Sequence, residues 1–185
     1  MDIFSAFGLS VSAGLNAYIP LIIIALLARF TDLIKLQSPW DFLTSWWVIG
    51  VLVVLSLVEF FADKVPAVNH INDIIQTFIR PTAGAIAFAA SAHTVTNMHP
   101  VISIIAGILV AGSVHAFKSL AVRPAVSVTT AGVGNVPVSI AEDIISIVTS
   151  IIAIVLPILI SIIIILILLI FIVIFWRRSN HKIAY

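Results

Sequence analysis

Long apolar runs separated by short polar stretches make up most of this chain. Five runs are candidates for membrane elements, because a helix needs about 20 mostly apolar residues to cross a bilayer core of about 30 Å. The runs cover residues 4–30, 46–62, 83–96, 101–120 and 144–176. The pattern predicts an all-α integral membrane protein, a single membrane domain over the whole chain with about five transmembrane helices.

Prolines interrupt the first and the last of these runs. A proline lacks a backbone donor and breaks or kinks a helix, and Pro20 and Pro157 both lie in otherwise apolar surroundings. The last run is too long to cross the core upright, so we expect it to tilt, to kink at Pro157 or to project beyond the bilayer. Its second half, residues 158–175, has Ser161 as its only polar side chain and is expected to face lipid.

The connections between the runs differ in character. Residues 31–45 combine charges with aromatic side chains, which is typical of a loop at the membrane surface. Residues 63–81 are semi-polar and contain two prolines, and we expect them to connect two spans. Residues 122–137 carry no charge after Arg123, are rich in glycine and threonine, and show no helical period. This last segment is predicted to be a surface loop or a re-entrant loop that lines a cavity.

A weak internal similarity relates residues 46–96 to residues 101–157. The sequence Val-Glu-Phe-Phe at 58–61 parallels Val-His-Ala-Phe at 114–117, and a Pro-Ala-Val follows each of them. One interpretation is a duplicated helical hairpin, since repeats are common in transporters. The other is chance similarity between apolar segments.

Composition agrees with the membrane prediction and narrows the classes of function. Charged residues make up 9% of the chain, against about a quarter in soluble domains, so the chain lacks the residues that would cover a water-soluble globule. A net charge of +1 argues against nucleic-acid binding. The chain has no cysteine, no metal-ligand spacing, and no nucleotide or nucleophile motif. We therefore expect no metal and no cofactor, and we do not favour an enzyme.

Two features bear on how the chain is placed in a membrane. The first residues lack the basic stretch of a signal peptide, so we expect the first apolar run to be kept as a span. Arg177, Arg178 and Lys182 favour a cytoplasmic C-terminus by the positive-inside rule. Basic residues in the other connections keep this bias slight.

Ionisable residues in or beside apolar runs are costly, which makes them the first candidates for a site. Glu59 and Asp63 are four residues apart and share a helical face. Two carboxylates so placed repel unless a cation, a proton or a basic partner lies between them. Lys64 is adjacent but points to another face. The pair predicts a cation or proton site, or else an ion-paired helix end at the membrane surface.

Basic residues gather at the end of the fourth run. His115 and Lys118 share a helical face, and Arg123 follows just beyond. If the second and fourth runs pack together, these side chains neutralise Glu59 and Asp63 in a buried polar network. Such a network binds a substrate, relays protons or fixes helix packing. Taken alone, His115 fits a hydrogen-bonded packing role better than a metal ligand.

Two acidic residues open the last run. Ser139 and Glu142 have the spacing of a capping box, in which the serine caps the helix and the glutamate bonds back to the serine N–H. Asp143 is not needed for such a box and gains from the positive end of the helix dipole, so it stays a site candidate.

Asn16 lies among small residues, which let helices approach closely. Pro20 cannot donate a hydrogen bond to the carbonyl of Asn16, so this carbonyl is free beside the amide side chain. The arrangement predicts a substrate or ion contact, or else a plain kink within a packed face of small residues.

These candidates belong to a longer set of motifs. The set comprises Ser12-Ala13-Gly14-Leu15-Asn16-Ala17-Tyr18-Ile19-Pro20-Leu21, Glu59, Ala62-Asp63-Lys64-Val65-Pro66, Asp73, Arg80-Pro81, Ala83-Gly84, His115, Lys118, Arg123-Pro124, Asn135, Ser139 and Ala141-Glu142-Asp143. Together, over residues 4–145, they resemble a family of small bacterial membrane proteins known as domain-of-unknown-function family 4126. The resemblance implies a multi-pass protein of a prokaryotic plasma membrane, adds Asp73, Arg80 and Asn135 to the candidates, and supplies no substrate.

We predict a transporter or channel for a small solute or ion, with a buried charged cluster as its site. One alternative is an intramembrane lipid-processing enzyme, and another is a structural or partner-binding protein whose cluster only locks its helices. Five helices enclose little volume, so we expect a homo-oligomer in the lipid bilayer. The candidate substrate- or ion-binding residues are Asn16, Glu59, Asp63, Lys64, Asp73, Arg80, His115, Lys118, Arg123, Asn135, Glu142 and Asp143.

Overall fold

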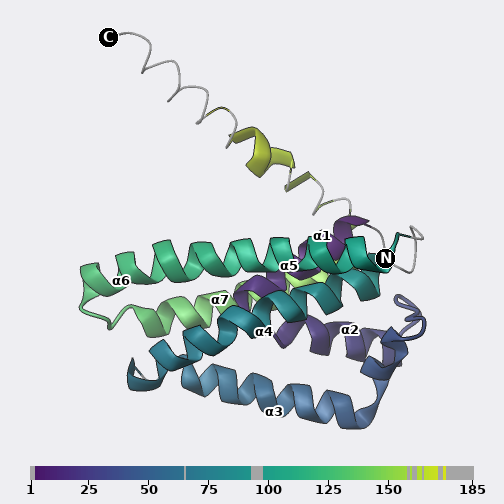
Figure 1. The fold of residues 1–185 in the computed structure, drawn as a ribbon, viewed down its shortest axis with the longest axis horizontal. Coiled ribbons are helices and arrows are strands. Elements are labelled where there is room, and N and C mark those ends of the chain that lie inside the picture. Colours follow the sequence, from purple (N-terminus) through teal and green to yellow (C-terminus); the bar gives the residue numbers. More distant parts are fainter. Residues whose placement is uncertain are drawn as a thin grey trace.

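The computed structural model describes residues 3–64, 66–92 and 98–157, with residues 159, 162–163, 165–170 and 173, and gives the backbone alone for 66–71. Across these residues the structure is helical and contains no strand, which confirms the all-α prediction (Figure 1). The elements are α1 (Ile3–Leu15), α2 (Ile19–Phe30), the 3-10 helix η1 (Trp40–Thr44), α3 (Trp46–Ala62), α4 (Pro66–Ala92), α5 (Pro100–Phe117), the π-helix η2 (Lys118–Val122), α6 (Arg123–Thr130) and α7 (Asn135–Val155).

The first apolar run forms a hairpin of two short helices rather than the single interrupted span that was predicted. In Figure 1, α1 enters the body from the end that holds the N-terminus, and α2 returns to that end. The helices have 13 and 12 residues, roughly 20 Å each, well short of a bilayer core. The chain turns because Asn16 Oδ1 accepts hydrogen bonds from the N–H groups of Tyr18 and Ile19, and because Pro20 fits the first turn of α2.

The apolar run at 46–62 forms a helix as predicted, whereas the helix that contains the third run begins earlier than predicted. α3 coincides with the apolar run at 46–62. α4 begins at Pro66 and continues through Pro81, so the predicted connection over 63–81 is wrong beyond its first residues. Its polar residues suggested a loop, but several of them line a buried face of the helix.

α5, η2 and α6 form one continuous helix over residues 100–130. The chain passes Pro124 because the helix widens there. Pro124 cannot donate to the carbonyl four residues earlier, and in the π turn before it the N–H of Arg123 bonds the carbonyl of Lys118, five residues earlier.

The predicted loop over residues 122–137 is therefore wrong. The chain reverses only at residues 131–134, where Ala131 and Gly132 adopt φ angles of 51° and 87°. These left-handed conformations let the chain turn back within a few residues. α7 then begins at Asn135.

The predicted capping box is also wrong, because α7 begins at Asn135, four residues before Ser139. Ser139 and Glu142 lie inside α7 rather than at its start. The hydroxyl of Ser139 donates to Asp63 Oδ2 at 3.2 Å, and Glu142 pairs with Lys118. Both side chains therefore make contacts with other helices.

The last apolar run is broken at the predicted proline. α7 ends at Val155, and Leu156 leaves the helical conformation just before Pro157. Residues 165–170 are again helical, with exposed apolar side chains. Ser161 and the basic residues Arg177, Arg178 and Lys182 lie outside the described residues.

Small residues bring α1, α4 and α5 into close contact. A Cβ atom added to Gly14 would lie 2.6 Å from Val114 Cβ. A Cβ on Gly84 would overlap Ala111, and one on Gly107 would overlap the carbonyl of Gly84. The backbones thus meet where any larger side chain would force the helices apart.

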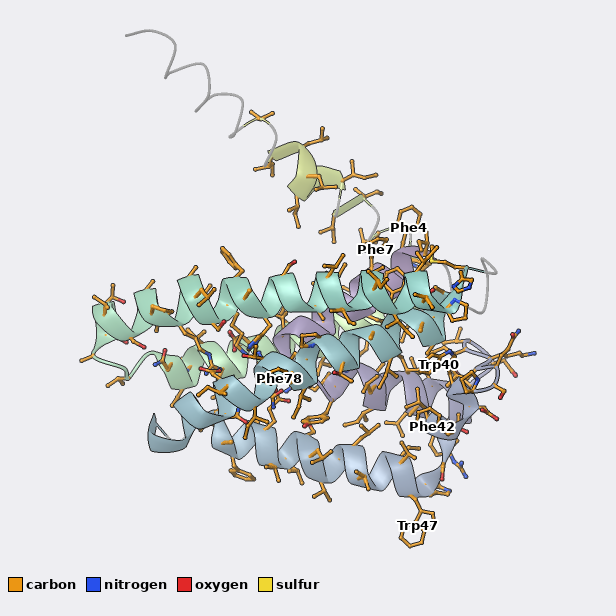
Figure 2. All side chains as sticks on the ribbon, in the orientation of Figure 1. Phe4, Phe7, Trp40, Phe42, Trp47 and Phe78 are labelled. Carbon is orange, nitrogen blue, oxygen red and sulfur yellow. The ribbon has the colours of Figure 1, made fainter. Side chains whose placement is uncertain are left out.

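Buried ionic side chains and exposed aliphatic side chains occur together in this bundle. Arg80 is fully buried, whereas Val54 and Leu109 are 59% and 62% exposed. Trp47 is 86% exposed and points away from the bundle in Figure 2. Among the described residues, two helices, 100–130 and α7, are long and apolar enough to cross a membrane.

Candidate functional site

A network of ion pairs lies inside the bundle, near the end where α3 joins α4 and α6 joins α7. It contains five of the eight acidic residues of the chain and four of its nine Lys and Arg residues. The acidic members are Glu59, Asp63, Asp73, Glu142 and Asp143, and the basic members are Lys64, Arg80, Lys118 and Arg123. Lys64 and Asp143 pair with each other beside the other seven residues, and we call the whole set the charge network.

Arg80 lies at the centre of the charge network. Its Nη2 is 2.8 Å from Glu59 Oε1 and 3.8 Å from Asp63 Oδ2. Its Nη1 donates to the carbonyl of Gly14 at 3.3 Å, and lies 3.4 Å from His115 Nδ1. One guanidinium thus joins α4 to α3, α1 and α5.

The contacts of His115 define its tautomer. A guanidinium has no acceptor, so Nδ1 of His115 accepts the hydrogen bond from Arg80. Nε2 then carries the proton and donates to Thr77 Oγ1 at 3.2 Å. His115 is therefore neutral in this arrangement, and it orients Arg80 rather than neutralising a carboxylate.

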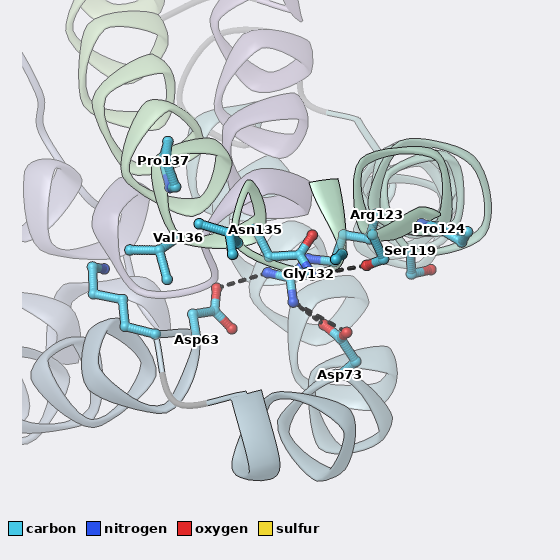
Figure 3. Close-up of a pocket in the computed structure, with 13 residues that line it drawn as sticks. Asp63, Asp73, Ser119, Arg123, Pro124, Gly132, Asn135, Val136 and Pro137 are labelled. Carbon is cyan, nitrogen blue, oxygen red and sulfur yellow. Dashed lines mark hydrogen bonds and ion pairs between the residues drawn. The ribbon is translucent and has the colours of Figure 1, made fainter. Parts of the chain in front are cut away.

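Arg123 bridges three carboxylates from three helices or helix ends. It lies 3.0 Å from both Asp63 Oδ2 and Asp73 Oδ1, and 3.7 Å from Glu142 Oε2. Figure 3 shows Arg123 between Asp63 and Asp73. Because Arg123 contacts all three, any of these carboxylates can release it without leaving it unpaired.

Asp63 receives more donors than any other carboxylate described here. Besides Arg123 and Arg80, Asn72 Nδ2 donates to it at 2.7 Å and Ser139 Oγ at 3.2 Å. Asp63 lies in the connection between α3 and α4. Burial would raise its pKa, but the positive charges around it, Arg123 first, hold the pKa below its ordinary value.

The π turn explains why Lys118 and Arg123 both face inward. Residues five apart close one turn of a π-helix, whereas in an α-helix they would point to different faces. Lys118 Nζ lies 2.6 Å from Glu142 Oε2 and donates to the carbonyl of Leu15 at 3.1 Å. The widened turn thus places two cations against one carboxylate of α7.

The tip of the α1–α2 hairpin reaches the same network. Asn16 Nδ2 donates to Asp143 Oδ1 at 3.0 Å, while Lys64 Nζ lies 3.6 Å from the other oxygen of Asp143. The amide of Asn16 therefore has two roles: its oxygen caps α2 and its nitrogen bonds the charge network.

A cavity of about 820 Å³ borders the network (Figure 3). Asp63, Asp73 and Arg123 line its inner part, and the exposed Ala131 and half-buried Gly132 of the turn line its outer part, so it reaches the protein surface. The remaining lining residues are Lys64, Ser119, Pro124, Ser127, Val133, Asn135, Val136 and Pro137.

Asn135 is a neutral lining residue with an unused acceptor. Its Nδ2 donates to Ser127 Oγ at 2.8 Å, while its buried Oδ1 has no hydrogen-bond partner. Among the described residues, no three His, Cys, Asp or Glu side chains are grouped so as to hold a metal ion.

The structure brings eleven of the twelve candidate residues into the charge network or its immediate contacts, and the twelfth, Asn135, lines the adjacent cavity. Two details differ from the prediction. Glu59 pairs with Arg80 of α4, rather than with the basic residues at the end of the fourth run. Of those residues, Arg123 pairs with Asp63 as predicted, whereas Lys118 pairs with Glu142 and His115 contacts Arg80.

Sequence reasoning missed several polar partners on α4 and at the hairpin tip. Asn72 and Gln76 are buried and, with Arg80, recur every four residues, which marks one face of a helix. That spacing indicates a helix, but the semi-polar composition and the two prolines of the segment favour a connection. Tyr18, whose side chain hydrogen-bonds Gln76, had no such signal.

Comparisons with known proteins place the chain in a family. No curated protein and no solved structure matched it. A family model described as a domain of unknown function (DUF4126) matches residues 3–178, which extends beyond the motifs at 4–145 into the isoleucine-rich tail. The chain therefore belongs to the family of proteins that share the domain of unknown function 4126.

Proposed function

We propose that this chain is an integral membrane protein of a prokaryotic plasma membrane that moves a small charged solute or ion. The observation that carries the proposal is the surface-open cavity whose inner part is lined by Asp63, Asp73 and Arg123 of a buried charge network. Water and a solute that enter this cavity reach the charges directly.

The membrane part of the proposal rests on the inverted polarity. Buried ionic groups and exposed aliphatic groups are stable together when the surroundings are lipid rather than water. Helix 100–130 and α7 have the required length and composition. The short α1–α2 hairpin is a form of backbone break that a bilayer tolerates where the tip is buried in protein, as Asn16 is.

The transport part rests on the exchangeable partners in the charge network. A network that only locked helices would need one partner for each charge. Here Arg123 contacts three carboxylates, and Asp63 lies within 4 Å of both Arg80 and Arg123. A solute that binds one of these groups leaves the others paired, so entry and release cost less free energy.

Thiol labelling tests both parts, because the chain has no cysteine. Single cysteines replace Ser127 in the cavity wall, Val54 on the exposed face of α3, and Ser10, which is buried. The full-length chain is placed in vesicles, and a membrane-impermeant maleimide is added from either side. We expect Ser127→Cys to be labelled from one side only, and Val54→Cys and Ser10→Cys to stay unlabelled.

Each contrary result removes one part of the proposal. Labelling of Val54→Cys from water would mean that α3 does not face lipid. Absence of labelling at Ser127→Cys from both sides would mean a dry packing network and would end the transport proposal. If Ser127→Cys is labelled, small cations, anions and zwitterions are screened for protecting it, and uptake of any protecting solute into vesicles is measured. The expected homo-oligomer stays a prediction.

A further inference from the structure

The charge network is short of one positive charge. It holds five carboxylates and four basic side chains, and His115 adds no charge because its Nδ1 accepts a hydrogen bond from Arg80. A surplus charge in a buried network is costly, and proteins relieve it with a bound cation or a proton. The missing positive charge is expected beside a carboxylate oxygen that has no partner.

Glu59 Oε2 is the oxygen that lacks a partner. Four buried carboxylate oxygens of the described residues accept no hydrogen bond. Three of them lie beside a cation: Asp73 Oδ1 at 3.0 Å, Glu142 Oε2 at 2.6 Å and Asp143 Oδ2 at 3.6 Å. Glu59 Oε2 likewise accepts no hydrogen bond, although Glu59 is only 2% exposed, and the closest contact with Arg80 is made by the other oxygen of Glu59.

The surroundings of Glu59 favour a proton over a metal ion. Arg80 holds the other oxygen of Glu59 at 2.8 Å, and a metal cation in the same place would be repelled by its guanidinium. Gln76 carries a second buried, unpartnered oxygen, and the Tyr18 hydroxyl that bonds Gln76 lies within electrostatic reach of Glu59. A proton on Glu59 would remove the net negative charge of the network, whereas the unpartnered Arg80 Nε is a donor and cannot supply a further charge.

We infer that Glu59 is a proton-binding residue, and that its proton is the ion whose movement is coupled to the solute. The coupling of this proton to the solute rests on the proposed function. A proton from water binds Oε2 of the Glu59 carboxylate, which becomes a neutral acid, and the same proton returns to water on release. Asp63 on its own helix, Arg80 from α4, Tyr18 from the hairpin tip and Lys118 from η2 are the charged or titratable groups that face it.

Protonation of Glu59 changes the pairing next to the cavity. Neutral Glu59 holds Arg80 less strongly, and Arg80 Nη2 is already 3.8 Å from Asp63 Oδ2. As Arg80 moves to Asp63, it competes with Arg123 for that carboxylate. Arg123 then stays paired with Asp73 and Glu142. A proton at Glu59 thus loosens the cation that lines the cavity and links proton binding to solute binding.

The chain allows a direct measurement because Glu59 and Glu142 are its only glutamates. Glutamate labelled with carbon-13 at the carboxyl group gives two side-chain signals in the full-length protein in lipid nanodiscs. Either Glu142→Gln or Glu59→Gln assigns them, so one folded variant is enough. Spectra are recorded from about pH 8 to about pH 5, and we expect the Glu59 signal to move toward the neutral-acid position as the pH falls.

The inference is overturned if Glu59 stays ionised over this range, or if Glu142 takes up the proton in its place. The Ser127→Cys labelling rate supplies a second readout. Divided by the labelling rate of a free small thiol at the same pH, it should change along the Glu59 titration in the otherwise unchanged chain, and Glu59→Gln should remove this remaining pH dependence. If Glu59 titrates while Ser127→Cys is never labelled, proton binding stands and the proposed transport fails.

Discussion

The two ends of the helix bundle are held together in opposite ways. At one end, which we call the small-residue end, α4 and α5 meet through Gly84, Gly107 and Ala111, with no space for another carbon atom. At the other end, which we call the charged end, Arg123 and Asp73 form an ion pair between α4 and the helix over residues 100–130, and a cavity of about 820 Å³ remains. One set of helices is thus closed at one end and open at the other.

This difference indicates how a small bundle can admit water from one side only. Side-chain length sets the distance between helices, and the length changes along α1 within one turn. Ser12 Oγ bonds Ser146 and Ser150 of α7 directly, at 2.7 Å each, whereas Asn16 reaches Asp143, which Lys64 also approaches. The α1–α2 hairpin ends at the boundary between the two kinds of packing.

Removing Arg80 is the strongest way to break the charged end. Arg80→Met keeps most of the side-chain volume but leaves Glu59 without its cation in a fully buried place. We expect a loss of about 3–5 kcal/mol in the free energy of unfolding. Thermal and denaturant unfolding of the purified protein in lipid or detergent measures this loss.

A double variant separates loss of charge pairing from loss of packing. In Arg80→Met with Glu59→Gln, no charge is left unpaired at Glu59, so part of the lost stability should return. Equal or greater destabilisation of the double variant would show that Arg80 acts mainly through Gly14 and His115, its other contacts.

Gly107→Ala tests the small-residue end, again through the free energy of unfolding. The added Cβ would overlap the carbonyl of Gly84 and lie 2.6 Å from Ala85 Cα, so the two backbones must separate. We expect a loss of about 1–3 kcal/mol. The matched control is Gly50→Ala on α3, where no atom lies within 4 Å of the new carbon and a gain of up to about 1 kcal/mol is expected.

If Gly107→Ala unfolds no more easily than Gly50→Ala, the close helix contact is not what holds this end. If it is destabilised as expected, labelling at Ser127→Cys in the same background shows whether loosening the closed end alters the open one. Unchanged labelling would mean that the two ends respond independently.

The charged end was easier to predict from sequence than the course of the chain through it. Charges in apolar runs are few and expensive, so each one is a candidate for a buried pair, and the structure brings Glu59, Asp63 and Arg123 together. Their pairing could not be predicted, because it depends on which faces of α3, α4 and η2 meet. Arg80 entered through the family resemblance alone.

The predicted helix boundaries were wrong where polar residues or prolines lie inside long helices. Pro81 and Pro124 both lie within continuous helices, because the interior of a bundle accepts a missing hydrogen bond or a π turn. At Asn16 the opposite error occurred: the apolar run was predicted to be one interrupted span, but the chain folds back there into two short helices. The duplication of 46–96 and 101–157 stays a prediction.

The smallest expected effect lies at the outer edge of the charged end. Asp73 has a side chain that is 22% exposed in the cavity, and Arg123 keeps Asp63 and Glu142 when Asp73 becomes neutral. For Asp73→Asn we therefore expect a loss below about 1 kcal/mol in unfolding free energy, measured beside Arg80→Met under the same conditions. A loss as large as that of Arg80→Met would mean that all carboxylates of the network act as one unit. The gradient from a rigid centre to an exchangeable edge would then be absent, and with it the physical basis for a solute replacing one partner at a time.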